Sequence, residues 1–177
     1  MRTLIIHESL FGNTKAVAAA IKQGLSRGKA PDHVEVVRAD EAPGVIPDDV
    51  SLLIVGGPTH AFSMTRESTR KDAETKGASE HVRTGIREWI DTVLPKPDLP
   101  IVTFDTRVKV KLLPGSAAKS AVRALRARGF RRVEQGETFW VEDTDGPLRA
   151  GELVRAEEWG HDLASRADLR PGATAAR

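Results

Sequence analysis

The stretch Thr3-Leu4-Ile5-Ile6-His7-Glu8-Ser9-Leu10-Phe11-Gly12-Asn13-Thr14-Lys15 decides the fold, because it joins a short apolar run directly to a helix through one compact polar loop. After it, apolar residues recur at helical spacing, at Val17, Ala20, Ile21, Gly24 and Leu25. An apolar strand that leads through a loop into an amphipathic helix is the first half of a βαβ unit. The stretch therefore predicts a domain with a mostly parallel sheet.

The same alternation continues along the chain. Further strands are expected at 34–37, 52–55 and 101–104 and, as a broken run, at 130–141. Leu52-Leu53-Ile54-Val55 has no polar alternation, which indicates a central strand covered on both faces. Helical stripes are expected at 17–25, at 82–93, at 118–125 between a Gly115-Ser116 cap and Gly129, and at 150–164 with Leu153, Ala156, Gly160 and Leu163 inward.

Length and composition indicate one domain without covalent cross-links. The 177 residues, 40% of them hydrophobic, suffice for one core, and we expect it to span 1–164, with a disordered tail at 165–177. No apolar run approaches the ~20 residues of a membrane-spanning helix and no secretion signal begins the chain, so a cytoplasmic protein is expected. With no cysteine, disulfides, thiolate metal sites and iron–sulfur clusters are excluded, so redox chemistry requires a cofactor.

The charges do not indicate a polymeric or membrane partner. The 27 Lys and Arg residues are balanced by 25 Asp and Glu residues, and the basic stretch 123–132 continues a helical pattern with a solvated face. We therefore predict no nucleic-acid and no membrane partner. The five histidines show no paired ligand spacing, so no metal site is predicted.

Function is sought in the loops after the strands, because ligands of open parallel sheets bind beyond the carboxyl ends of the strands. The loop from Ser9 to Thr14 opens a helix, where backbone N–H groups and the helix dipole favour a phosphate. It matches neither the Walker A motif nor the Gly-x-Gly-x-x-Gly fingerprint, which weakens the nucleoside triphosphate and NAD interpretations. A capped helix start without a ligand is the alternative.

Two later loops have the composition of ligand walls. Gly56-Gly57-Pro58-Thr59-His60-Ala61-Phe62 offers close backbone approach, a hydroxyl, an imidazole and a ring. Phe104-Asp105-Thr106-Arg107 offers polar groups for the edge of a flat heterocycle, with Phe104 either in the core or beside the ring. The polar segment 65–81 is longer than an ordinary connection, and an active-site lid, an exposed helix and a solvated excursion are all open for it.

These three loops, in this order, resemble those of the flavodoxin family, particularly the flavodoxin-like proteins common in actinobacteria. The most specific matches are Glu8 to Thr14 and Gly56 to His60, and the resemblance covers roughly residues 1 to 164. It implies a three-layer α/β sandwich, with a five-stranded parallel sheet in the order 2-1-3-4-5, helices on both faces and FMN at the carboxyl edge. By that resemblance Ser9, Phe11, Gly12, Asn13 and Thr14 hold the phosphate, Pro58, Thr59, His60, Ala61 and Phe62 form one wall of the flavin ring site, and Thr103, Phe104, Asp105, Thr106 and Arg107 form the other.

The sequence also departs from that family. Flavodoxins usually enclose the flavin ring between aromatic side chains, often a tyrosine, whereas this chain has no tyrosine and leaves the role to His60, Phe62 or Trp140, or one ring face open. Where flavodoxins commonly have a glycine whose peptide reaches the flavin, the loop reads His60-Ala61-Phe62. The surface also lacks the marked acidity of flavodoxins.

The leading functional interpretation is an FMN-dependent redox protein in which the flavin carries the electrons and no side chain acts as acid or base. Its partner is a redox protein or a small-molecule electron acceptor. Two alternatives stay open: an NAD(P)H:quinone-type oxidoreductase, and a flavodoxin-like binding or regulatory domain that has lost flavin. The sequence leaves the oligomeric state open.

Overall fold

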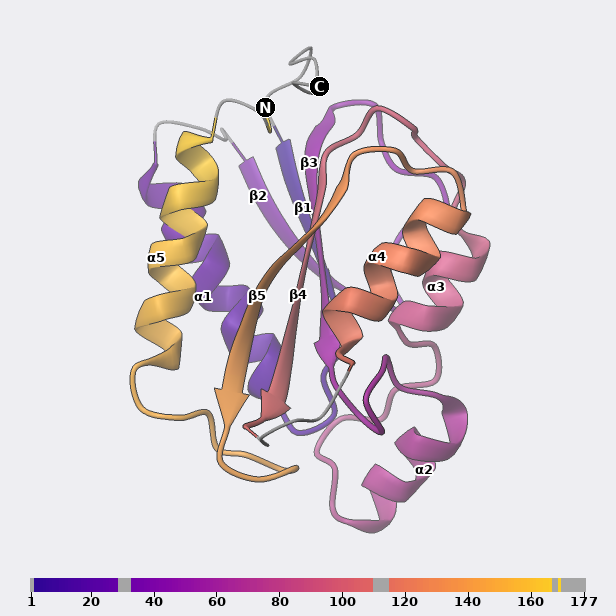
Figure 1. Ribbon diagram of the computed structural model, residues 1–177, viewed down its shortest axis with the longest axis vertical. Coiled ribbons are helices and arrows are strands. Elements are labelled where there is room, and N and C mark those ends of the chain that lie inside the picture. Colours follow the sequence, from indigo (N-terminus) through magenta and orange to yellow (C-terminus); the bar gives the residue numbers. More distant parts are fainter. Residues whose placement is uncertain (1, 29–32, 110–114, 167–168, 170–177) are drawn as a thin grey trace.

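A five-stranded parallel sheet in the order β2-β1-β3-β4-β5 forms the centre of the molecule, as predicted (Figure 1). The computed structural model describes residues 2–28, 33–109, 115–166 and 169. The strands are β1 (Arg2–His7), β2 (His33–Arg38), β3 (Val50–Pro58), β4 (Ile101–Val108) and β5 (Val133–Val141). All carboxyl ends of the strands therefore meet at one edge of the sheet.

Helices cover both faces of the sheet. Helices α1 (Asn13–Arg27) and α5 (Glu152–Ser165) lie on one face, and α3 (Ile86–Thr92) and α4 (Ala117–Ala127) lie on the other (Figure 1). Alternate strand residues supply two cores, because successive side chains of a strand point to opposite faces. In β1, for example, Ile5 packs with the α1 and α5 side, whereas Leu4 and Ile6 pack with the α3 and α4 side.

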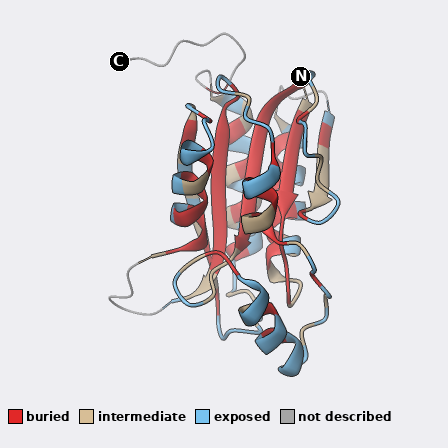
Figure 2. Cartoon of the chain, turned by 90° about the vertical axis from the view of Figure 1, so that its right-hand side faces the viewer, coloured by how far each residue is buried: buried red, intermediate tan, exposed pale blue. Residues whose placement is uncertain are grey.

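Helix α2 (Glu67–Thr75) lies outside these layers, beyond the carboxyl edge of the sheet. Most of its side chains are exposed (Figure 2). The sequence left a lid, an exposed helix and a solvated excursion open for residues 65–81, and the structure has an exposed helix there. None of the helices in the described ranges is long and apolar enough to cross a membrane.

Several predicted boundaries were wrong at the site edge. Strand β4 does not end at Phe104 but continues to Val108, because Asp105 to Val108 pair with Thr138 to Val141 of β5. Strand β3 likewise continues to Pro58, paired with Thr106. Asp105, Thr106 and Arg107 therefore lie on a strand, which positions side chains more rigidly than a loop.

Three single positions also differ from prediction. Val82 precedes α3 and packs instead with Leu10. Leu153 is 46% exposed, because the inward face of α5 is formed by Glu152, Ala156, Gly160 and Leu163. Phe130 is buried before the start of β5 at Val133. Of the predicted tail, Ser165 ends α5 and Leu169 packs with the α1 and α5 core, while 167–168 and 170–177 lie outside the described residues.

Two glycines let α1 and α5 pack backbone against backbone. A Cβ atom added to Gly24 would stand 1.9 Å from the carbonyl oxygen of Glu157, and one added to Gly160 would stand 2.3 Å from that of Ile21. Both contacts are with backbone atoms, which cannot move aside as a side chain can. The two helices can therefore approach this closely only when both positions are glycine.

We predict that Gly24→Ala lowers the free energy of unfolding. Alanine in a helix interior is favoured over glycine by about 1 kcal/mol, but overpacking against backbone costs about 1–3 kcal/mol or more, so the net effect is destabilising. Urea unfolding followed by circular dichroism measures it. Gly44→Ala is the control, because nothing lies within 4 Å of a Cβ there; equal stability of both variants would contradict the close contact.

Candidate functional site

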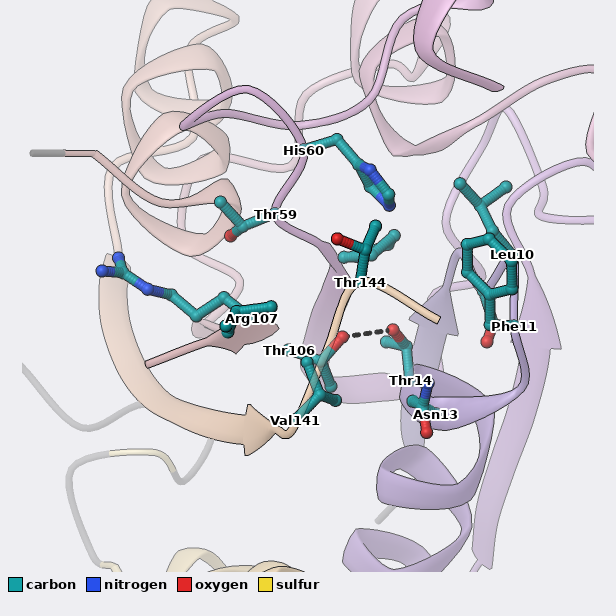
Figure 3. A pocket seen from close by; sticks show the side chains of 13 residues that line it. Leu10, Phe11, Asn13, Thr14, Thr59, His60, Thr106, Arg107, Val141 and Thr144 are labelled. Atoms are coloured by element: carbon teal, nitrogen blue, oxygen red, sulfur yellow. Dashed lines mark hydrogen bonds between the residues drawn. The ribbon is translucent and has the colours of Figure 1, made fainter. Parts of the chain in front are cut away.

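The candidate site is a pocket at the carboxyl edge of the sheet, between β1, β3, β4 and the residues that follow β5 (Figure 3). Nine of the sequence-predicted residues line it, together with four that the sequence did not single out. The predicted ones are Ser9, Phe11, Asn13, Thr14, Pro58, Thr59, His60, Thr106 and Arg107, and the additional ones are Leu10, Val108, Val141 and Thr144. The three predicted loops thus converge on one place.

The loop from Ser9 to Thr14 presents unused hydrogen-bond donors to this pocket. Gly12 precedes α1 in the left-handed region, with φ of 83°, and no side chain caps the helix. Within the described residues, no amide from Ser9 to Lys15 donates a backbone–backbone hydrogen bond. The Ser9 hydroxyl is buried and has no hydrogen-bond partner. Unpaired donors at a helix N-terminus form a site for an anion.

Two other members of the loop are tied to neighbouring segments. The hydroxyls of Thr14 and Thr106 are 2.7 Å apart and join the start of α1 to β4 (Figure 3). The Asn13 side-chain amide donates to the carbonyl of Asp145, at 3.0 Å. The first loop is therefore fixed both to the sheet and to the segment between β5 and α5, which sequence reasoning did not connect with it.

Asp105 is a fully buried structural centre and does not line the pocket. Its carboxylate accepts hydrogen bonds from the Thr59 hydroxyl (2.9 Å), the Thr138 hydroxyl (2.7 Å) and the Ala118 amide (3.1 Å). The Thr59 hydroxyl in turn accepts from the Ala117 amide at 2.8 Å. This network joins the ends of β3, β4 and β5 to the first turn of α4.

Arg107 is the arginine of the pocket lining, which contains no carboxylate. Its guanidinium donates to the Gly115 carbonyl at 2.8 Å and lies 5.5 Å from the ring centre of Trp140. Lys109 contacts the same ring, at 5.7 Å. Trp140 is thus held by cations beside the pocket. Burial, with a smaller effect of Lys76, lowers the pKa of His60 and so favours its neutral form.

The turn after β3 holds two non-glycine residues in the left-handed region. His60 and Ser63 exchange backbone hydrogen bonds of 3.0 and 3.1 Å, while Ala61 and Phe62 have φ of 45° and 66°. Each such conformation costs roughly 1–2 kcal/mol. Neither residue lines the pocket, and Phe62 is 51% exposed.

Thr103 and Phe104 lie away from the pocket. The Thr103 hydroxyl donates to the Ala118 carbonyl at 3.1 Å, within the layer under α4. Phe104 packs edge-on against Phe139 and Trp159, on the α1 and α5 side. Of the two positions that the sequence left open for Phe104, the structure has the one in the core. Gly12 contributes through its backbone shape and does not line the pocket.

A larger hollow runs along the outer side of α1 toward the opposite edge of the sheet. Most of its cationic side chains are already paired: Lys15 with Glu80, Arg27 with Glu157, and Arg38 with Asp40. Among the described residues, no group of three or more acidic or histidine side chains is arranged to hold a metal. The pocket at the carboxyl edge is therefore the better candidate for a ligand.

Solved structures with the same arrangement include flavodoxins. An archaeal flavodoxin superposes with a TM-score of 0.61 at 17% identity, covering 93% of this chain and 97% of that one. Flavodoxin 1 from Bacillus cereus gives 0.62 at 14%, covering 94% and 99%. A flavodoxin from Streptococcus pneumoniae TIGR4 gives 0.60 at 15%, covering 93% and 99%. The chain has a flavodoxin-like fold.

Sequence comparison adds nothing to this fold assignment. No protein-family model matches the chain, and no curated protein matches it significantly. At 14–20% identity, the flavodoxin-like fold is what these likenesses show. The finer resemblance to actinobacterial flavodoxin-like proteins stays a prediction.

We predict that Thr59→Val destabilises the protein by about 1–3 kcal/mol. Valine matches the shape of threonine but leaves the Ala117 amide without an acceptor and removes a donor to Asp105. Thr59→Ser keeps the hydroxyl and is the control, expected to lose much less. Thermal and urea unfolding measure both. An unchanged stability of Thr59→Val would contradict the importance of these hydrogen bonds.

We also predict a pH dependence that originates at His7, the last residue of β1. Burial, together with repulsion from Lys15 and Arg38, lowers the pKa of His7 to about 4. Between pH 6.5 and 4 the unfolded chain binds a proton that the folded chain does not, so stability falls as the pH falls through this window. His7→Gln removes this contribution. When the pH is lowered from 7 to 5, the free energy of unfolding should decrease in both proteins, but by about 2 kcal/mol less in His7→Gln than in the parent. If the free energies of unfolding of the two proteins change equally with pH, His7 is not the origin of the pH dependence.

Proposed function

We propose that this protein binds FMN in the pocket at the carboxyl edge and acts as a flavin-dependent redox protein. The observation that carries the proposal is the loop from Ser9 to Thr14, with its unpaired amides and the buried, unpartnered hydroxyl of Ser9 at the start of α1. These donors fit a phosphate group. Ser9, Asn13 and Thr14 border the place where the phosphate would lie.

The flavin ring would lie between the end of β3 and the end of β4. Pro58, Thr59 and His60 border one side, and Thr106 and Arg107 border the other. When bound, FMN supplies the ability to accept and pass on electrons. The side chains bind and orient it, and the charge of Arg107 favours the more negative, reduced form of a nearby flavin.

One observation favours the NAD(P)H:quinone-type oxidoreductase as a second candidate. Two aromatic side chains that the sequence offered as covers of the ring, Phe62 and Trp140, do not line the pocket: Phe62 is 51% exposed, and Trp140 lies against Arg107 and Lys109. An uncovered ring face leaves room for a second planar substrate to stack. Steady turnover of NAD(P)H with a quinone by the FMN-loaded protein favours this candidate, and reduction of a protein acceptor alone favours the electron carrier.

FMN binding is tested by titrating the flavin-free protein with FMN and with riboflavin, following flavin fluorescence. Quenching by FMN with a clear preference over riboflavin, which lacks the phosphate, is the expected result. A protein that ignores both flavins contradicts the proposal and favours a binding domain without flavin.

We predict that Ser9→Ala weakens FMN binding by about 10- to 100-fold, because a hydrogen bond to a charged group contributes about 1.5–3 kcal/mol. Riboflavin binding should change little. Ser26→Ala is the control, since Ser26 is an exposed serine of α1 outside the pocket. An equal loss for FMN and riboflavin would mean that Ser9 does not contact the phosphate.

A further inference from the structure

The segment from Thr65 to Val82, which includes α2, contacts the first loop and does not cover the pocket. None of its residues lines the pocket. In Figures 1 and 2 it extends beyond the carboxyl edge with one long side in solvent. The residues that it buries are the ones that contact the stretch from Glu8 to Phe11, through a polar cluster, a backbone hydrogen bond and an apolar cluster.

The polar cluster surrounds Glu8, the residue directly before Ser9. The Glu8 side chain is 1% exposed, and its two oxygens accept hydrogen bonds from the Thr65 hydroxyl and, at 2.9 Å, from the Ile86 amide at the start of α3. Burial raises the pKa of Glu8, and these two donors oppose that rise. A buried carboxylate needs such partners to be tolerated, so Thr65 and the start of α3 are held against the end of β1.

Arg70 of α2 completes this cluster. Its guanidinium lies 3.8 Å from the Glu8 carboxylate, donates to the Thr65 hydroxyl at 3.0 Å and donates to Glu88 at 2.9 Å. The Arg70 side chain is 4% exposed, although α2 is otherwise largely in solvent. The packing is tight, because a Cβ on Gly85 would stand 2.3 Å from Glu8 and 2.7 Å from Arg70. Arg70 thus fixes α2 to the start of the first loop.

The backbone and the side chain of Leu10 form the other two contacts. The Leu10 carbonyl accepts from the Glu80 amide at 3.1 Å. Its side chain is buried in a small cluster with Ala73 and Val82, against which Phe11 packs. Lys15, in the first turn of α1, pairs with Glu80 at 3.0 Å. The segment therefore contacts the first loop before, within and after the residues that would hold the phosphate.

We propose that the segment from Thr65 to Val82 is a brace that holds the first loop in its anion-binding shape, with Arg70 as the positioning residue. This inference rests on the proposed function for the identity of the anion, the phosphate of FMN. Free donors bind an anion tightly only when they are already in position, since ordering them on binding costs free energy. Arg70 therefore sets the preference for a phosphorylated flavin without touching it.

The test compares Arg70→Met with Lys71→Met, its neighbour on α2, whose ammonium pairs with Glu67 on the surface. Both variants lose one positive charge and keep a long side chain. Affinities for FMN and riboflavin are measured by fluorescence quenching, and the backbone order parameters of residues 9–14 by nuclear magnetic resonance without flavin. Glu8→Gln/Arg70→Met, which removes both buried charges together, replaces the single variant if that one does not fold.

Arg70→Met should weaken FMN binding at least tenfold, leave riboflavin binding within threefold, and lower the order parameters of the loop from about 0.85 toward 0.6. Lys71→Met should change none of these. Equal losses for both flavins, or an unchanged loop, would overturn the brace. If the parent binds neither flavin, the proposed function fails, whereas the order parameters still decide whether Arg70 holds the loop.

Discussion

A buried carboxylate has to be surrounded by donors, and in this protein two such groups organise the functional edge of the sheet. Asp105 of β4 accepts hydrogen bonds from Thr59, directly after β3, from Thr138 of β5 and from the first turn of α4. Glu8 after β1 collects them from Thr65 and from the start of α3, with Arg70 nearby. Because an unsatisfied buried charge costs several kcal/mol, the segments that supply these donors have little freedom to move. The residues that follow these two carboxylates in the sequence, Ser9 and Thr106, both line the pocket.

The parts of this arrangement that follow from periodic patterns were predictable from the sequence. The apolar run at 52–55 indicated the central strand, and the loop from Ser9 to Thr14 stood at the start of a helix as expected. The extension of β4 was not predictable, because Asp105, Thr106 and Arg107 are polar and reveal themselves as strand residues only when paired with β5.

The brace was beyond sequence reasoning for a related reason. Arg70 is buried although it lies in a stretch of charged residues whose pattern is typical of a solvent-exposed segment. Its burial depends on Glu8, which is sixty-two positions away in the sequence. Val141 reaches the pocket because β5 pairs with β4, and Thr144 lies in the segment that the Asn13–Asp145 hydrogen bond joins to the first loop. Local propensity carries no signal for such contacts. A glutamate placed directly before a polar loop, where an apolar strand ends, was the one available hint.

The backbone contact between α1 and α5 has a consequence for how the chain folds. The two helices are separated in sequence by β2, β3, β4 and β5, yet Gly24 and Gly160 place them in direct contact. On a ribosome, α1 emerges long before its partner, so the surface of α1 that packs against α5 stays uncovered until the last helix has been synthesised. Closing this pair joins the beginning of the domain to its end, a contact of high sequence separation and therefore slow to form. The layer that carries the first loop is thus the last to be completed, and the pocket matures only when translation of α5 is over.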